Sequence, residues 1–274
     1  MYENRITAFI DILGFRNIIQ KTTQNDEYAK QILAVLNSMK SEEIIKEMFV
    51  EINEKEADEE KMQELLKMQS LLSEQMRKES SLQVTHFSDS IVISIGLEND
   101  MYAMSMIEYV VRLIYRLWRD FKILIRGAIV VDKFVHIENG AIIGPALVKA
   151  YDYETNLANY PRIILDDLCY NIINNSSSYN ILKNMFKPYS EEKNINGKIF
   201  KIQKGYEMNL ATAIKHLLNS PFTFHEGVRK KVFEELNQSK SYLEQMIEDV
   251  SSENIKKKYE YLITEIVNTE YPKA

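Results

Sequence analysis

The chain has 274 residues, of which 45% are hydrophobic and 27% are charged, and its formal net charge is −6. This length and composition suit one large soluble domain with an appendage, and the acidic balance argues against a nucleic-acid-binding surface. No apolar stretch approaches the roughly 18 residues that cross a bilayer, and the amino terminus has no signal core. The single cysteine, Cys169, excludes a disulfide framework and a multi-cysteine zinc site, so we expect a cytoplasmic protein with no membrane partner.

The first third of the chain predicts a strand, a helix and a charged helical insert. Residues 5–13 are apolar except for Asp11 and predict a buried strand, and Gly14-Phe15 then turns the chain into a helix over about 16–39. The apolar residues expected on the inward face of that helix are Ile18, Ile19, Ile32, Leu33 and Leu36. Residues 40–80 are rich in Glu, Lys, Met and Gln and predict two helices that form an insert.

The remaining elements follow from local patterns and turn signals. In order, we expect a hairpin over 82–95 around Ser88-Asp89-Ser90, a helix over 102–121, a strand over 122–131, a strand pair over 134–143, a helix from Gly144-Pro145 to about Leu157, a strand over 161–166, helices over 168–187 with a break at 174–178, a short edge strand over 197–202, and helices only from Tyr206 onward. This order predicts an α+β fold in which helices flank one sheet. We expect a core domain over 1–204 with the insert at about 40–80, and a helical extension over 205–274 packed on that core.

Asp11 and Asp89 each lie in an apolar segment with high β propensity. A buried carboxylate must be protonated, hydrogen-bonded or bound to a cation, and two neighbouring carboxylates repel each other unless a metal lies between them. Carboxylate oxygens suit Mg²⁺ or Mn²⁺, and the backbone N–H groups of Leu13, Gly14 and Phe15 are placed to meet phosphate oxygens. Two plainer interpretations stay open: Asp11 as a helix N-cap, and Asp89 as an ordinary turn residue.

Four motifs resemble class III nucleotide cyclases. Residues 9–15 (FIDILGF) are similar to the first metal motif F-x-D-I-x-G-F, and residues 87–90 (FSDS) are similar to the second metal loop. Residues 126–129 (RGAI) resemble the R-x-G-I strand, and residues 144–154 (GPALVKAYDYE) resemble the G-x-x-V-N-x-A-x-R-x-E helix. The resemblance spans roughly residues 5–166 and implies a ferredoxin-like, palm-type sheet.

The resemblance also implies a site and a mode of assembly. Two divalent ions, Mg²⁺ or Mn²⁺, would bind at Asp11, Ile12 and Asp89 and act on a nucleoside triphosphate. The site would form between the subunits of a homodimer, with the 144–154 helix reaching into the metal site of the partner.

The chain departs from this family at four positions. The two residues that read a purine base align with Thr85 and Ala141, while the transition-state Asn and Arg align with Val148 and Asp152. The cations considered as replacements for that Arg are Arg126, Lys149 and Arg162. His136, His216 and His225 have no metal-ligand spacing, and we expect structural roles for them, while His86 is expected to be a structural or surface residue.

This combination is similar to the bacterial pyrimidine cyclases of the Pycsar antiphage systems. The resemblance implies that UTP or CTP is converted to the 3′,5′-cyclic monophosphate, a second messenger for a cyclic-nucleotide-binding effector. Two alternatives are an inactive cyclase-homology module that binds a nucleotide or a partner, and a purine cyclase with atypical base recognition. The first is favoured by Val148 and Asp152.

Overall fold

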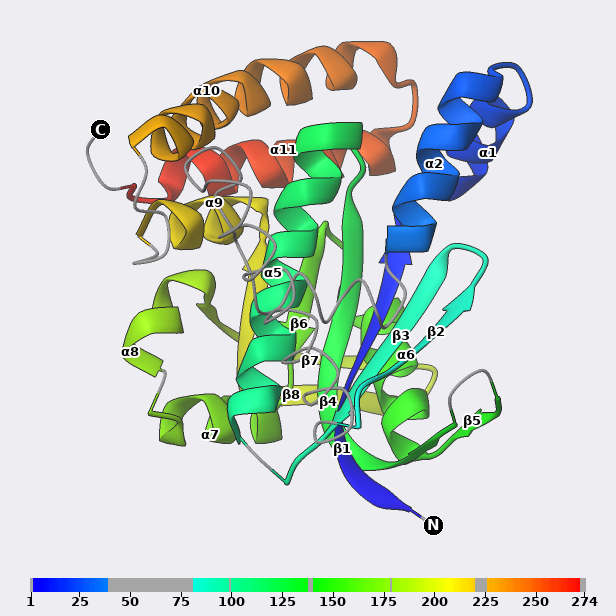
Figure 1. Cartoon of the computed structure of the whole chain (residues 1–274), viewed down its shortest axis with the longest axis vertical. Coiled ribbons are helices and arrows are strands. Elements are labelled where there is room, and N and C mark those ends of the chain that lie inside the picture. Colours follow the sequence, from blue (N-terminus) through cyan, green and yellow to red (C-terminus); the bar gives the residue numbers. More distant parts are fainter. Residues whose placement is uncertain are drawn as a thin grey trace, which may run out of the picture.

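The protein is represented by a computed structural model that describes residues 2–38, 81–98, 100–137, 140–177, 179–219 and 226–271 (Figure 1). The helices expected over 40–80 lie outside these residues. The strands are β1 (Glu3–Ile12), β2 (Gln83–Phe87), β3 (Ser90–Gly96), β4 (Ile125–His136), β5 (Ile142–Ile143), β6 (Arg162–Leu165), β7 (Lys187–Ile195) and β8 (Lys198–Asn209). The helices are α1 (Phe15–Thr22), α2 (Asp26–Ser38), α5 (Asp100–Phe121), α6 (Pro145–Asn156), α7 (Asp167–Asn175), α8 (Tyr179–Leu182), the 3₁₀ turn η1 (Lys183–Met185), α9 (Leu210–Asn219), α10 (Glu226–Asp249) and α11 (Glu253–Asn268).

The strands form one mixed sheet in the order β2-β3-β1-β4-β6-β8-β7, and β5 pairs with the end of β4. Its first half follows the chain order strand, helices, two strands, helix, strand, with β4-β1-β3-β2 side by side and antiparallel. This is the ferredoxin-like arrangement. The predicted α+β fold with a ferredoxin-like, palm-type sheet flanked by helices is therefore confirmed. β6 then adds to β4 in parallel, and β8 and β7 continue the sheet as an antiparallel hairpin.

Alternation along the strands gives the sheet two apolar faces. On one face, Ile6, Ala8 and Ile10 of β1 belong to the large core that includes Trp118 of α5. On the other face, Phe9 packs with residues of β3, β4 and α6 in a smaller cluster. Figure 1 shows α5 on one side of the sheet, with α10 and α11 stacked beyond one end of it. None of the described helices combines the length and apolarity needed to cross a membrane.

The single helix predicted over 16–39 is wrong, because the chain forms α1 and α2 with a break between them. The hydroxyls of Thr22 and Thr23 donate back to carbonyls of α1, and the Asn25 side chain accepts from the Tyr28 N–H at 3.0 Å, which starts α2. The inward face of α2 also differs from the expected one. Ile32 is buried, whereas Leu33 is 59% exposed.

Several predictions for the second half of the chain are also wrong. The strand expected over 122–131 extends to His136, so the pair expected over 134–143 is only the end of β4 with the two-residue β5. The edge strand expected over 197–202 is the start of the longer β8, which lies inside the sheet, and β7 is the edge. β8 continues to Asn209, so helices begin at Leu210 and not at Tyr206. The predicted boundary at residue 204 between the core domain and the helical extension stays a prediction, and it falls within β8.

Candidate active site

The carboxyl end of β1 brings together three of the predicted site residues. Asp11 lies opposite Ser90 of β3 and opposite Arg126 of β4 in the sheet register. The Ile12 N–H donates to the Asp89 carbonyl at 2.9 Å, which fixes the β2–β3 turn against β1. The fold thus places Asp11, Asp89 and Arg126 at one end of the sheet, although they come from three separate segments.

A buried glutamate from α6 completes this cluster. The Arg126 Nε–H donates to Asp11 Oδ2 at 3.2 Å, and the same nitrogen lies 2.7 Å from Oε1 of Glu154 in an ion pair. The Glu154 side chain is only 3% exposed. Glu154 was not among the predicted site residues, although it is the last residue of the 144–154 motif. The sequence feature that could have identified Glu154 is its position on the same helix face as Ala146 and Ala150, which are both buried against the sheet.

The carboxylates interact unfavourably with one another. Burial raises the pKa of Asp11, the Arg126 hydrogen bond and charge lower it, and the Asp89 charge raises it again. Burial likewise raises the pKa of Glu154, with Arg126 opposing this effect and Asp11 adding to it. The Arg126 guanidinium therefore pairs with two carboxyl groups, and the charge of a third, Asp89, acts on Asp11; a bound cation would stabilise this arrangement.

The donor set suits a hard divalent cation that keeps other oxygen ligands. Within the described residues, no group of three or more His, Cys, Asp or Glu side chains is arranged around one metal position. Asp11 and Asp89, with the predicted Ile12 backbone, offer two carboxylates. Mg²⁺ is commonly bound by one or two carboxylates together with waters and substrate phosphates, so these residues fit that ion.

Lys258 of α11 is a further cation near this cluster. It lines a pocket of about 610 Å³ together with Leu13 and Gly14. Burial and the Arg126 charge lower the pKa of Lys258, whereas Asp11 and Glu154 raise it. The C-terminal helices therefore contribute a positive charge to the surroundings of Asp11.

The turn after β1 has one N–H group fewer for an anion than expected. Gly14 precedes α1 with φ +74°, and a Cβ there would meet nothing within 4 Å, so the backbone conformation alone favours glycine. The Leu13 N–H donates to the Leu124 carbonyl at 2.9 Å. Only the N–H groups of Gly14 and Phe15 remain of the three that were predicted to meet phosphate oxygens.

The predicted base-reading residues lie along β2 and next to β5. The Thr85 hydroxyl is 2.9 Å from His136 Nε2 at the end of β4. Ala141 is exposed, and its carbonyl accepts from the Ile137 N–H at 3.2 Å. The contact between His136 and Thr85 was not predicted. No sequence spacing indicates it, because the two residues are 51 positions apart.

Two of the proposed replacement cations are held elsewhere in the protomer. Lys149 Nζ lies 2.6 Å from Asp166 Oδ2, and Arg162 pairs with Glu207 at 2.8 Å. A different cation pairs with a side chain of α6: Lys198 Nζ of β8 lies 2.6 Å from Asp152 Oδ2. The position where the resemblance expects an arginine therefore carries an aspartate that holds a lysine.

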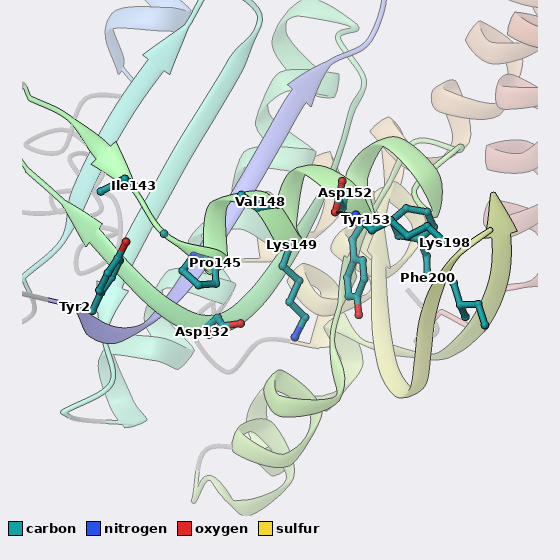
Figure 2. A pocket seen from close by; sticks show the side chains of 12 residues that line it. Tyr2, Asp132, Ile143, Pro145, Val148, Lys149, Asp152, Tyr153, Lys198 and Phe200 are labelled. Carbon is teal, nitrogen blue, oxygen red and sulfur yellow. Dashed lines mark hydrogen bonds and ion pairs between the residues drawn. The ribbon is translucent and has the colours of Figure 1, made fainter. Parts of the chain in front are cut away.

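The exposed side of α6 borders a surface pocket of about 550 Å³ (Figure 2). Figure 2 shows Lys149 extending from α6 on the side away from Val148, with Asp152 and Lys198 farther along the same pocket. Val148, at the position of the expected asparagine, is 59% exposed.

No protein-family model and no curated protein matches this chain. Among solved structures, the chain is similar to the catalytic core of a rhodopsin-guanylyl cyclase with converted specificity, at 15% identity and TM-score 0.42, covering 76% of this chain and 96% of that one. It is also similar to the adenylyl cyclase CyaB from P. aeruginosa, at 12% identity and TM-score 0.41, covering 76% and 94%. A bacterial light-regulated adenylyl cyclase has 12% identity and TM-score 0.41, covering 85% and 99%.

Proposed function

We propose that this protein is a nucleotidyl cyclase that acts on a nucleoside triphosphate. The observation that carries the proposal is the cluster of Asp11, Asp89 and Arg126 at one end of the sheet, beside the Gly14 turn. In the reaction, the ribose 3′-oxygen bonds to the α-phosphorus as the bond to pyrophosphate breaks, and the hydroxyl proton passes to solvent. The cyclic monophosphate, the pyrophosphate and the released proton together account for all the atoms of the substrate.

The residues of the cluster have separable roles in this proposal. Two divalent cations held by Asp11, Ile12 and Asp89 would supply charge neutralisation at the phosphates and activation of the hydroxyl. Arg126 opposes the rise that burial causes in the pKa of Asp11 and orients phosphate oxygens, while Glu154 keeps the guanidinium in place. The N–H groups of Gly14 and Phe15 donate to the same phosphates.

Phosphoryl transfer also needs positive charge near the leaving group. Lys258 is near the cluster in the same protomer. Lys198 lies on the outer side of α6, where it is held by Asp152, and it would act from a second subunit. We therefore propose a homodimer with composite sites, in which Lys198 reaches the metal site of its partner.

We infer a pyrimidine triphosphate, UTP or CTP, as the substrate. Thr85 and Ala141 carry no charged group for a purine edge, and Thr85 offers one hydroxyl that suits a smaller base. The cyclic product would be a second messenger read by an effector in antiphage defence, as the sequence resemblance implies.

The direct test is to incubate the purified protein with each of the four NTPs and Mn²⁺ and to identify products by mass spectrometry. We expect cyclic UMP or cyclic CMP, and a loss of about 100-fold or more for Asp89→Ala, because the variant removes half of the carboxylate pair. Asp26→Asn, an exposed aspartate of α2, is the matched control and should keep full activity. Electron paramagnetic resonance measures Mn²⁺ binding independently of turnover. We expect Asp89→Ala to bind Mn²⁺ more weakly than the unmodified protein.

A lack of cyclic product from all four NTPs would exclude the enzymatic proposal. Cyclic AMP or cyclic GMP as the main product would leave a cyclase and remove the pyrimidine assignment.

A second candidate function is a nucleotide-binding module without turnover. It is favoured by the aspartate at position 152 and by the exposed Val148, since neither side chain donates a hydrogen bond to a phosphate. This candidate predicts calorimetric binding of an NTP with Mg²⁺ and no cyclic product.

A further inference from the structure

A hydrogen-bonded chain of four side chains runs through the sheet and ends at Thr85. The Arg5 Nε–H donates to Ser94 Oγ at 3.0 Å, Ser94 Oγ lies 2.8 Å from His136 Nδ1, and His136 Nε2 lies 2.9 Å from Thr85 Oγ1. Arg5 is 3% exposed, Ser94 is fully buried and His136 is 9% exposed. Thr85 is half-buried, so it is the end of the chain that a ligand can reach.

The direction of the chain follows from its donors. A guanidinium can only donate, so Ser94 Oγ accepts from Arg5. The Ser94 hydrogen then needs an acceptor, and the acceptor within reach is His136 Nδ1. A neutral imidazole that accepts at Nδ1 carries its hydrogen on Nε2, which therefore donates to Thr85. Burial, with a further contribution from the Arg5 charge, lowers the pKa of His136 to about 4, so the ring is neutral at physiological pH.

The opposite direction would leave a buried hydrogen unpaired. If His136 donated from Nδ1, Ser94 would accept twice, and its own hydrogen would have no acceptor among the residues that the structure describes. An unpaired buried donor carries a desolvation cost that the first direction avoids. In the favoured direction, the Thr85 oxygen accepts from His136, which strengthens its own O–H as a donor and weakens its remaining lone pair as an acceptor.

We propose that His136, held by Ser94 and Arg5, makes Thr85 a hydrogen-bond donor to the nucleobase, and that the site therefore prefers uracil to cytosine. This inference rests on the proposed function, because it takes Thr85 to face the base. His136 acts through Thr85 and is a positioning residue. A chain that begins at a cation polarises each successive bond in the same sense, which strengthens the terminal donor.

The two bases differ at C4 and at N3, and the hydrogen-bonding patterns at these two positions are opposite. In this proposal Thr85 is directed at C4, the edge remote from the sugar. Uracil has a carbonyl oxygen there, which accepts a hydrogen bond, whereas cytosine has an amino group, which donates. A donating Thr85 directed at this group matches O4 and places hydrogen against hydrogen at the amino group. A site built for one hydrogen-bonding pattern discriminates strongly against the reverse pattern.

The test compares UTP with CTP in the full-length protein and in two pairs of variants. Thr85→Val and His136→Leu remove the hydroxyl and the ring donor, whereas Thr85→Ser and His136→Gln keep a hydroxyl and an amide that can both accept and donate. For each, kcat/KM for both nucleotides and the calorimetric Kd for both are measured, with circular dichroism as a check of folding. We expect the unmodified protein to prefer UTP by at least about tenfold, the value of one well-matched hydrogen bond.

The two conservative variants should keep most of this preference, and the two disruptive variants should bring the UTP/CTP ratio close to one. Equal use of the two nucleotides, a preference for CTP, an unchanged ratio in Thr85→Val, or no binding of either nucleotide would each overturn the inference. Tighter binding of UTP without turnover would support the inference and reject the cyclase proposal. Turnover with a preference for CTP would support the cyclase proposal and overturn the inference about uracil.

Discussion

Arg126 is shared between two carboxylates that come from distant parts of the sequence. Asp11 lies near the end of β1 and Glu154 near the end of α6, yet both contact the same guanidinium nitrogen, at 3.2 and 2.7 Å. With Asp89 in the adjacent turn, this cluster has more negative than positive groups. Burial makes that imbalance costly in the absence of a cation, which is the physical reason to associate the cluster with a divalent ion.

His136 should make the stability of the protein depend on pH. An unfolded histidine takes up its proton near pH 6.5, whereas the folded His136 does so only near pH 4. Between these values the unfolded state binds more protons, so the free energy of unfolding should fall as the pH drops from about 6.5 to about 4. One pKa unit corresponds to about 1.4 kcal/mol, which gives a loss on the order of 3 kcal/mol, measured by urea unfolding at a series of pH values.

His136→Gln provides the control for this titration. The amide keeps a donor and an acceptor but does not titrate, so the variant should lack this part of the pH dependence. Identical pH profiles for the two proteins would show that His136 is not held neutral by the fold.

The sequence predicted the two aspartates of the cluster, but not all of the residues that surround them. Asp11 and Asp89 stand out because each is a charge inside an apolar segment. Glu154 and Lys258 lie on amphipathic helices, where charged residues are ordinary, so only the packing of α6 and α11 identifies them. The contact of His136 with Thr85 likewise depends on the pairing of strands and has no local signal.

At the scale of elements, the close approach of β4 to β1 depends on Gly127. A Cβ at this position would lie 2.3 Å from the Phe9 carbonyl oxygen and 2.9 Å from Ile163 Cδ1. Gly127→Ala should push β4 away from β1 and move the neighbouring Arg126 away from Asp11. We expect a loss of about 3 kcal/mol in the free energy of unfolding, at the upper end of the cost of overpacking.

Gly14→Ala is the matched comparison, because the added methyl group meets no atom within 4 Å and only the left-handed backbone conformation is unfavourable. That variant should lose about 1 kcal/mol. Urea unfolding of both variants checks the order, and an equal or smaller loss for Gly127→Ala would contradict the packing argument.

Elements with strong local patterns were predicted, and elements defined by pairing were not. β1, the β2–β3 hairpin, α5 and α6 follow from apolar runs and turn residues close in sequence. β7 has a charged, largely exposed sequence with Pro188, which is tolerated at a sheet edge but does not predict a strand. Its partner β8 was only partly predicted, because the Asn196-Gly197 turn gains its meaning once β7 is in place.

On the scale of the whole molecule, one face gathers apolar side chains that the described protomer leaves exposed. Tyr2, Ile143, Val148 and Ile199 come from four different segments, are each at least half exposed, and line the same pocket beside α6 (Figure 2). Asp152 and Lys198 lie at the same pocket. An apolar patch bordered by charged groups is typical of a protein–protein interface, and the composite site proposed above requires a second copy of the chain there.

Val148→Asp should therefore convert a dimer into a monomer. The substitution places a charge in the centre of the proposed interface, next to Asp152, where burial against a second copy would leave it without a partner. Val267→Asp on α11 is the control, since Val267 is 60% exposed and Val148 is 59% exposed, and the control should stay dimeric. Sedimentation velocity measures the mass of each variant in solution. Cyclase activity should fall with the loss of the dimer, because Lys198 then no longer reaches the Asp11 cluster of a partner. A Val148→Asp protein that remains dimeric, or a monomer that retains full activity, would contradict the composite site.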